Sequence, residues 1–316
     1  MKYQKLGKTD ITVSELCFGL LPMGPLQANI SSQEGGKLIR QALDKGINFI
    51  DTAESYGTYE HILKGTEGFS GKVVMSSKSA AHDYEGMEKA IQDALKATKR
   101  EVIDIFHLHA ARADKDVFKI REQAFQCILD YKEKGYVRAA GVATHSVEVA
   151  ELASTMPEID VVHPLINKGS LGIIKGNAED MIEAIHKCSA AGKGIYAMKA
   201  LAGGNLVGEL SDSINFVRNI KGIHSVAVGM IKEKELELNY RVFNDEIISD
   251  DILAGLKNTK KVIIRDSLCK RCGLCIDTCP NYALDMRNET IVVNYDKCIL
   301  CGYCYPSCPQ FAIRLV

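Results

Sequence analysis

Short apolar segments alternate with longer segments of helical hydrophobic spacing over residues 1–245. The short segments predict eight strands, at 13–20, 47–53, 73–79, 102–110, 137–144, 161–167, 194–203 and 225–231. Helical spacing predicts helices between them, among them 32–46, 86–99, 118–135, 177–192 and 233–245. Eight strands that alternate with helices favour an α/β fold, a (β/α)8 TIM barrel.

A doubly wound sheet is the alternative fold for this alternation. It usually carries a G-x-G-x-x-G turn after its first strand. The corresponding turn here reads GLLPMGP over residues 19–25. The barrel is therefore the preferred fold for residues 1–245.

The pattern changes after residue 245. Residues 246–261 are polar and weakly helical, which predicts a connector, and 262–316 form short apolar segments around cysteines. This C-terminal segment contains a repeat, CKRCGLCIDTCPNYAL from Cys269 and CILCGYCYPSCPQFAI from Cys298. We expect it to be a separate small α+β domain of the ferredoxin-like type, because each half has the C-x2-C-x2-C-x3-C-P spacing of bacterial [4Fe–4S] proteins.

The spacing also predicts how the eight cysteines are shared between two [4Fe–4S] clusters. In each half, three closely spaced thiolates surround one cluster, and the fourth ligates the other cluster. The predicted ligands are Cys269, Cys272, Cys275 and Cys308 for cluster 1, and Cys298, Cys301, Cys304 and Cys279 for cluster 2. Zinc is the alternative metal, but zinc sites use cysteine pairs separated by a spacer.

Composition excludes several classes of protein. The formal net charge of the 316 residues is -1, so we expect no nucleic-acid partner. The sequence has neither an apolar run of about 18 residues nor a signal peptide, so we expect no membrane insertion. Clustered cysteines without a signal peptide favour a metal protein of the reducing cytoplasm.

Four titratable residues are predicted at the carboxyl ends of adjacent strands. Asp51 ends the second strand, Tyr56 follows in its loop, Lys78 ends the third strand, and His109 ends the fourth. Active sites of barrels lie at this end. We expect Lys78, held by Asp51, to lower the pKa of Tyr56, and His109 to orient a carbonyl oxygen beside its hydroxyl. The set suits protonation of a carbonyl oxygen while hydride reaches its carbon.

Each of these residues also has a purely structural interpretation. Asp51 could cap a helix, and Lys78 could be a solvated lysine. His107 lies on the same strand face as His109, so a His-x-His metal site is an alternative, although we interpret His107 as structural. The coincidence of all four residues at one end of the barrel favours the catalytic interpretation.

The first 243 residues resemble the aldo/keto reductases. The resemblance rests on KLGKTDITVSELCFG, GINFIDTAESYGTYEHIL, SSKSAA, IDIFHLHAA, GVATHS, VVHPLIN, AMKALAGG and VGMIKEKELELN. It implies that Asp51, Tyr56, Lys78 and His109 are the catalytic tetrad and that the cofactor is NAD(H) or NADP(H). The implied cofactor contacts are Thr144, His163 and Asn167 at the nicotinamide, Met198 beneath it, Ala202, Gly203 and Gly204 at the pyrophosphate, and Asn239.

Several positions depart from the family pattern. Met198 replaces a common aromatic residue, and Glu235 stands where many members carry an arginine for the 2′-phosphate. A carboxylate there repels a phosphate, which favours NAD(H). Lys232 or Lys234 could compensate, and Glu235 could equally be a solvated residue of a helix first turn.

The sequence therefore predicts an iron–sulfur-containing reductase of a small aldehyde or ketone, or the reverse alcohol oxidation, with Tyr56 as proton donor. Hydride transfer moves two electrons and a [4Fe–4S] cluster moves one, so electron exchange between them needs a mediator such as a flavin, for which no motif is found. The clusters could instead serve a redox partner protein. The alternative function is electron transfer or redox sensing without carbonyl turnover.

Overall fold

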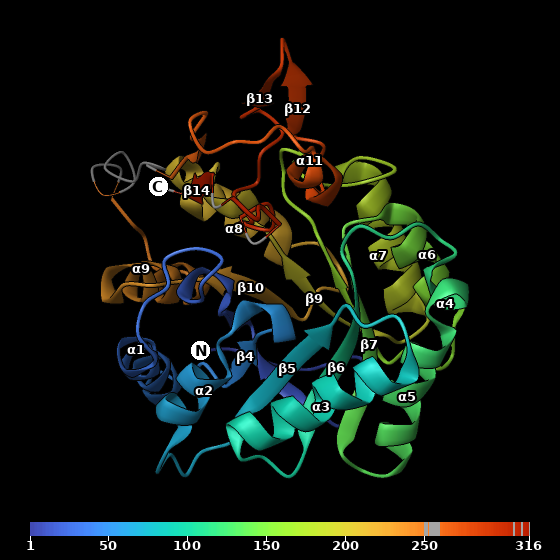
Figure 1. Ribbon diagram of the computed structural model, residues 1–316. Coiled ribbons are helices and arrows are strands. Elements are labelled where there is room, and N and C mark those ends of the chain that lie inside the picture. Colours follow the sequence, from blue (N-terminus) through green and yellow to red (C-terminus); the bar gives the residue numbers. More distant parts are fainter. Residues whose placement is uncertain (250–251, 253–259, 306, 311, 316) are drawn as a thin grey trace.

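The computed structural model describes residues 1–249, 252, 260–305, 307–310 and 312–315. Its larger part is a closed barrel of eight parallel strands (Figure 1), which confirms the predicted fold. The strands are β3 (Leu16–Gly19), β4 (Phe49–Asp51), β5 (Val74–Ser79), β6 (Ile103–Ala110), β7 (Val137–Thr144), β8 (Val161–Pro164), β9 (Gly194–Met198) and β10 (Ser225–Gly229). They follow chain order around the barrel, and β10 closes it against β3.

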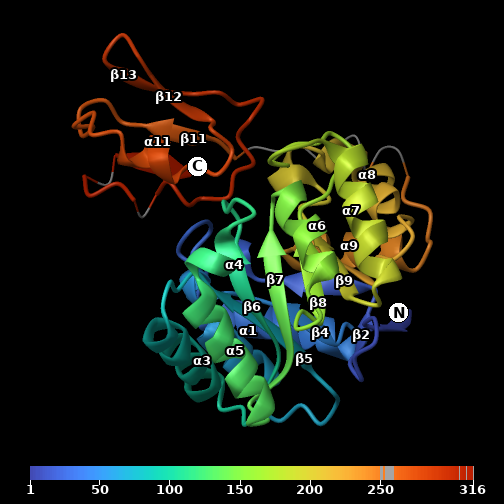
Figure 2. The ribbon, with the colours of Figure 1, turned by 90° about the vertical axis from the view of Figure 1, so that its right-hand side faces the viewer.

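Helices surround the strands on the outside of the barrel (Figure 2). They are α1 (Ser32–Asp44), α2 (Tyr59–Thr66), α3 (Tyr84–Thr98), α4 (Val117–Ile120), α5 (Glu122–Glu133), α6 (Val147–Thr155), α7 (Ala178–Ala190), α8 (Leu210–Arg218) and α9 (Glu233–Phe243). Local sequence sets some boundaries: Ser31 and Glu34 form a reciprocal capping box at the start of α1. The helical stretches named from the sequence match α1, α3, α4 with α5, α7 and α9, but not α2, α6 or α8.

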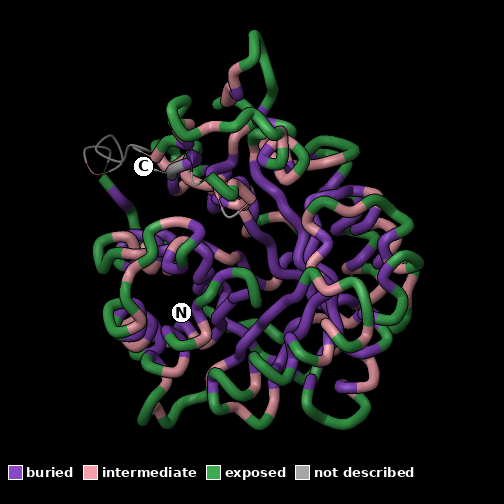
Figure 3. Tube along the Cα trace, viewed as in Figure 1, coloured by how far each residue is buried: buried purple, intermediate pink, exposed green. Residues whose placement is uncertain are grey.

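An N-terminal hairpin closes the amino-terminal end of the barrel. Its strands β1 (Tyr3–Lys5) and β2 (Thr12–Ser14) pair antiparallel. The sequence analysis had merged β2 and β3 into one strand. Leu6 and Ile11 of the hairpin join Phe49 and Tyr196 in a cluster of buried side chains. Figure 3 shows that burial is concentrated in the barrel strands.

The C-terminal part is a small α+β unit. Strand β11 (Val262–Ile264) pairs with β14 (Ile313–Leu315), and β12 (Leu284–Arg287) pairs with β13 (Thr290–Val293), with α11 (Leu274–Thr278) between them in sequence. Most of the connector predicted at 246–261 lies outside the described residues, so the predicted domain boundaries stay a prediction.

This C-terminal unit lies over the end of the barrel where the carboxyl ends of the strands point (Figures 1 and 2). Two hydrogen bonds join the parts: Gln27 Nε2 donates to the Leu300 carbonyl at 3.2 Å, and Asn205 Nδ2 donates to the Cys298 carbonyl at 2.9 Å. Among the described residues, no helix has the length and apolar character needed to cross a bilayer.

Candidate functional site

Lys78 and Asp51 form a buried ion pair on adjacent strands β5 and β4. Lys78 Nζ donates to both carboxylate oxygens of Asp51 and to the Thr52 carbonyl, each at 2.7 Å. The Lys78 side chain is 1% exposed and that of Asp51 is 6% exposed. Buried charges are tolerated when they are paired and fully hydrogen-bonded, and all three ammonium protons have acceptors here.

Tyr56 lies beside this pair, on the short 3₁₀ helix that follows β4 (Glu54–Tyr56). Its ring centroid is 5.2 Å from Lys78 Nζ. Burial raises the pKa of Tyr56 well above its ordinary value, and Tyr303 and Asp51 raise it further. This differs from the expectation that Lys78 lowers that pKa. The physical reason is that the ammonium charge is already neutralised by Asp51.

His109 ends β6 on the other side of Tyr56, and the two ring centroids are 6.3 Å apart. Burial, with smaller contributions from Lys78 and His145, lowers the pKa of His109 well below its ordinary value. The imidazole is therefore neutral at pH 7. Arg121 fixes the strand end by donating to the His109 carbonyl at 3.0 Å. The structure thus brings the four residues of the predicted tetrad together.

A further buried tyrosine, which the sequence analysis did not identify, supports the tetrad from below. The Tyr196 hydroxyl donates to Asp51 Oδ1 at 2.8 Å and lies 2.7 Å from Ser76 Oγ and 2.9 Å from His107 Nε2. This network occupies His107 in the barrel interior, in agreement with its structural interpretation. Alternation along the strand places Tyr196 inside the barrel, but its partner depends on the barrel's register.

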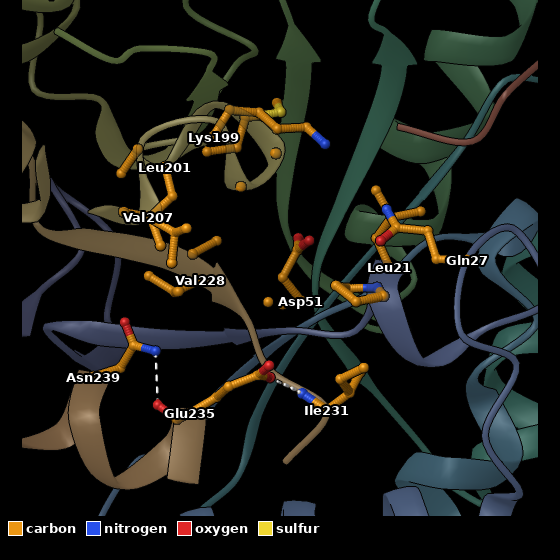
Figure 4. A pocket seen from close by; sticks show the side chains of 18 of the residues that line it. Leu21, Gln27, Asp51, Lys199, Leu201, Val207, Val228, Ile231, Glu235 and Asn239 are labelled. Atoms are coloured by element: carbon orange, nitrogen blue, oxygen red, sulfur yellow. Dashed lines mark hydrogen bonds between the residues drawn. The ribbon is translucent and has the colours of Figure 1, made fainter. Parts of the chain in front are cut away.

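A cavity of about 340 Å³ opens beside the tetrad. Figure 4 shows Asp51 among the residues that line it, with Lys199 and Leu201 on one side and Gln27 on another. Most of the predicted cofactor contacts line it as well: His163, Met198, Gly203, Gly204 and Asn239. His163 is held in place because its Nδ1 lies 2.6 Å from the Tyr196 carbonyl and its ring stacks on Tyr196.

Three described residues with predicted cofactor contacts, Thr144, Asn167 and Ala202, lie behind that lining. The polar atoms of Asn167 are used in its own loop: Nδ2 donates to the Leu171 carbonyl, and Oδ1 accepts from the backbone N–H of Gly169 and Leu171. Thr144 Oγ1 accepts from the backbone N–H of Ser146. These side chains stabilise the loops that shape the cavity, and their predicted contact with a cofactor stays a prediction.

Charged residues line the part of the cavity away from the tetrad. Glu235 Oε2 accepts from the Ile231 backbone N–H at 2.7 Å, a contact visible in Figure 4. Lys232 and Lys260 line the same region, and Lys199 lies nearer the tetrad. Lys260 belongs to the segment that the sequence analysis treated as a connector, so only the tertiary structure places it here.

The eight clustered cysteines form two groups of four. Cys269, Cys272, Cys275 and Cys308 line one small cavity, and Cys279, Cys298, Cys301 and Cys304 line another. The groups match the predicted ligand sets, including the exchange of the fourth cysteine. Burial and the neighbouring thiols raise the pKa of Cys275 to about 11. Thiolates this close repel one another unless a cation neutralises them, so this donor set fits iron.

Tyr303, between two of these cysteines, reaches the tetrad. Its hydroxyl oxygen lies 3.4 Å from His109 Nε2, and it hydrogen-bonds the hydroxyl of Tyr56. The sequence analysis did not identify Tyr303, because no local pattern shows which residue of a cluster loop contacts a distant barrel.

A closed parallel barrel with a buried Asp–Lys–Tyr–His group, joined to an eight-cysteine unit, defines an oxidoreductase-type barrel with an iron–sulfur domain. The chain belongs to the aldo/keto reductase family, whose sequence model matches residues 15–222, and the 4Fe-4S dicluster domain matches residues 261–309.

Curated relatives agree with this class. L-galactose dehydrogenase from Arabidopsis thaliana is 21% identical and aligns over 83% of this chain and 86% of its own length. 6-Dehydroglucose reductase from Novosphingobium aromaticivorans is 26% identical over 50% of this chain, and the match spans 59% of that protein. A solved structure from Pseudomonas aeruginosa, assigned to the aldo-keto reductases, shares the fold with a TM-score of 0.66 at 24% identity, covering 77% of this chain and 94% of its own.

Proposed function

We propose that this protein interconverts a small aldehyde or ketone and the corresponding alcohol, using a nicotinamide cofactor and Tyr56 as the proton donor. The observation that supports this most strongly is the convergence of Asp51, Tyr56, Lys78 and His109 beside a cavity that the strand ends of the barrel form. One listed relative is named as a reductase and another as a dehydrogenase, which supports chemistry in both directions.

The proton is held at the Tyr56 hydroxyl. Its raised pKa keeps it protonated at pH 7, and a protonated phenol can hydrogen-bond a carbonyl oxygen as negative charge develops there. Neutral His109 supplies a second hydrogen-bonding group to the same oxygen. The Lys78–Asp51 pair, 5.2 Å from the Tyr56 ring at Nζ, stabilises the phenolate left after proton transfer.

The cavity residues fit a nicotinamide dinucleotide. A bound nicotinamide would supply hydride. Gly203 and Gly204 expose backbone at the cavity wall, and Lys232 and Lys260 provide positive charge for phosphates. Asn239 Oδ1 is buried and lacks a hydrogen-bond partner among the described residues, so it is available to a donor on the cofactor. The Glu235 carboxylate suits ribose hydroxyls and repels a 2′-phosphate, which favours NAD(H) over NADP(H).

The eight cysteines are proposed to hold two [4Fe–4S] clusters that exchange electrons with a redox partner protein. Cys272 of the first group is exposed, whereas Cys301 of the second group is buried and packs with Met198 of the barrel. Electrons from a partner would therefore enter at the first cluster, and the second cluster would lie nearest the barrel site.

The test of the carbonyl chemistry is Tyr56→Phe, measured with NADH and a panel of aldehydes. Loss of a positioned proton donor costs roughly 10²–10⁴ in kcat, while the dissociation constant for NADH is expected to stay the same. The matched control is Tyr59→Phe, because the Tyr59 hydroxyl bonds Ser77 Oγ and contributes nothing to the tetrad. Unchanged turnover in Tyr56→Phe would remove Tyr56 from the proposed role.

A second candidate function is electron transfer without carbonyl turnover, and the position of Tyr303 favours it. The Tyr303 hydroxyl already occupies hydrogen-bonding positions on Tyr56 and His109. An anaerobic titration of the purified protein with NADH, followed by the visible absorbance of the clusters, separates the two functions. Bleaching supports electron flow between cavity and clusters and calls for a search for bound flavin; binding without bleaching favours the carbonyl reductase.

A further inference from the structure

The loop that carries Cys298 to Cys304 is held tightly in the mouth of the barrel. A Cβ added at Gly203, which has a φ of +72°, would lie 1.8 Å from the Ile299 carbonyl oxygen, and one added at Gly302 would lie 2.3 Å from the Leu26 carbonyl oxygen. Side chains with a Cβ do not tolerate such distances, so glycine at both positions permits backbone-to-backbone contact. The close approach that the sequence suggested for a cofactor at Gly203 is made here by Ile299.

Hydrogen bonds and apolar contacts reinforce this position. Asn205 and Gln27 donate to the loop carbonyls of Cys298 and Leu300. Ile299 and Cys301 join a buried cluster with barrel residues, namely Ala143, Leu165 and Met198. The loop is therefore a built part of the barrel mouth, and the placement of Tyr303 follows from it.

Tyr303 places a phenol where a substrate carbonyl would bind. Its hydroxyl hydrogen-bonds Tyr56 and lies 3.4 Å from His109 Nε2. Those are the two groups that the proposed function assigns to the carbonyl oxygen. Its ring packs against a cluster formed by Leu21, Leu26, Ala53 and Tyr56, and its centroid is 6.3 Å from that of His109.

We propose that Tyr303 is a specificity-determining residue of the substrate site, supplied by the iron–sulfur domain, and that its phenol holds the place of an aromatic carbonyl substrate. This inference rests on the proposed function. The Tyr303 oxygen stands in for the carbonyl oxygen, and its ring fills an apolar space that suits an aryl group. A substrate binds when it displaces Tyr303 and takes over both its hydrogen bonds and its ring contacts.

Displacement explains which carbonyl compounds are favoured. An aryl aldehyde or ketone recovers the apolar contacts that the Tyr303 ring gives up, whereas a short aliphatic aldehyde recovers the hydrogen bonds alone. Burial of a ring in place of solvent is favourable. The preference for aryl carbonyls should therefore be a property of the space that Tyr303 occupies.

The experiment uses the holoprotein with 4-nitrobenzaldehyde and butanal as carbonyl probes, and compares Tyr303→Ala and Tyr303→Phe with the wild type. Removing the competing side chain is expected to lower KM for 4-nitrobenzaldehyde about 10-fold in Tyr303→Ala, the equivalent of one or two hydrogen bonds. Tyr303→Phe, which keeps the ring and loses the hydroxyl, should lower KM by a smaller factor. In Tyr303→Ala, the ratio of kcat/KM for 4-nitrobenzaldehyde over butanal should exceed one.

The matched control is Tyr282→Phe, in the same domain. Tyr282 is exposed, and its ring stacks on Arg112 at 5.1 Å in the wild type, a contact that phenylalanine retains. Its kinetics should equal those of the wild type. Iron and acid-labile sulfide are measured for every variant, and Tyr303→Phe keeps the test valid if Tyr303→Ala does not assemble its clusters.

Binding of 4-nitrobenzyl alcohol, measured by calorimetry in the presence of NAD⁺, provides a readout that needs no turnover. Tighter binding in both Tyr303 variants than in the wild type supports the proposal, even if no variant reduces any aldehyde, in which case only the proposed function fails. Unchanged or weaker binding together with unchanged or raised KM overturns the role of Tyr303. Equal use of butanal and 4-nitrobenzaldehyde by Tyr303→Ala overturns the aromatic preference.

Discussion

The ammonium nitrogen of Lys78 lies 2.7 Å from each carboxylate oxygen of Asp51, with both side chains buried beneath the candidate active site. Removing one partner leaves the other as an unpaired buried charge. Lys78→Met should therefore lower the free energy of unfolding by about 3–5 kcal/mol and abolish turnover. Urea denaturation at pH 7 and steady-state kinetics measure the two effects.

The double variant Lys78→Met/Asp51→Leu separates stability from catalysis. With no charge left unpaired, most of the lost stability should return, because Tyr196 retains Ser76 and His107 as hydrogen-bond partners. Turnover should remain absent. Recovery of turnover in the double variant would contradict the proposed role of the pair.

Buried histidines should make the protein less stable in acid. Burial lowers the pKa of His107, His109 and His163 well below the ordinary value and that of His145 to about 3. A group with a lowered folded pKa contributes stability above its unfolded pKa of about 6.5, and this stability is lost as the pH falls toward the folded pKa. The free energy of unfolding should therefore decrease from pH 7 to pH 5.

The histidine contribution can be isolated by substitution. Each such histidine adds a slope of up to about 1.4 kcal/mol per pH unit, so His145→Gln should reduce the slope by about that amount. His82→Gln is the matched control, since His82 is exposed, and should leave the slope unchanged. Cluster absorbance is followed at each pH so that loss of iron is not counted as unfolding.

The contact between Gly203 and Ile299 predicts a specific defect in how the two domains associate. Gly203→Ala would place a Cβ 1.8 Å from the Ile299 carbonyl oxygen, so the cluster loop has to move away from the barrel. Hydrogen exchange at residues 298–305 should increase. Gly68→Ala is the control, because Gly68 has a φ of +68° but nothing within 4 Å of an added Cβ, and it should cost only about 1–2 kcal/mol of backbone strain.

The two groups of cysteines predict which substitutions affect the same cluster. Cys308→Ser should disturb the cluster of Cys269, Cys272 and Cys275, and Cys279→Ser the cluster of Cys301, because each lines that group's cavity. Mössbauer and electron paramagnetic resonance spectra of the anaerobic variants identify the affected cluster. A match of Cys279→Ser with Cys275→Ser, and not with Cys301→Ser, would contradict the exchanged arrangement.

Local periodicity was sufficient for most of the barrel. Each strand segment was visible because parallel barrel strands are buried on both faces and form continuous apolar runs. The N-terminal hairpin was missed because its second strand runs directly into β3 with a break only at Glu15. Helices such as α6, with a weakly amphipathic sequence, lack the strong hydrophobic spacing that identified α1.

The candidate site was predictable where residues lie at strand ends. Asp51, Lys78 and His109 could be placed together because all parallel strands of a barrel end on one face. The electrostatic state of Tyr56 was not predictable: its pKa is raised by burial and by Tyr303, a residue 247 positions later in the chain. Likewise, the pairing of Asn167 with its own loop depends on how that loop folds.

The amino-acid sequence by itself determined the two-part architecture and the sharing of eight cysteines between two groups. Both follow from short-range rules, namely hydrophobic periodicity and the reach of a few residues around a cluster. Only the tertiary structure decided that Tyr303 meets His109, 194 residues away, that Tyr196 supports Asp51, and that Lys260 lines the cavity. These contacts arise from the packing of distant segments, and packing depends on the complementary shapes of surfaces that exist only after each part has folded.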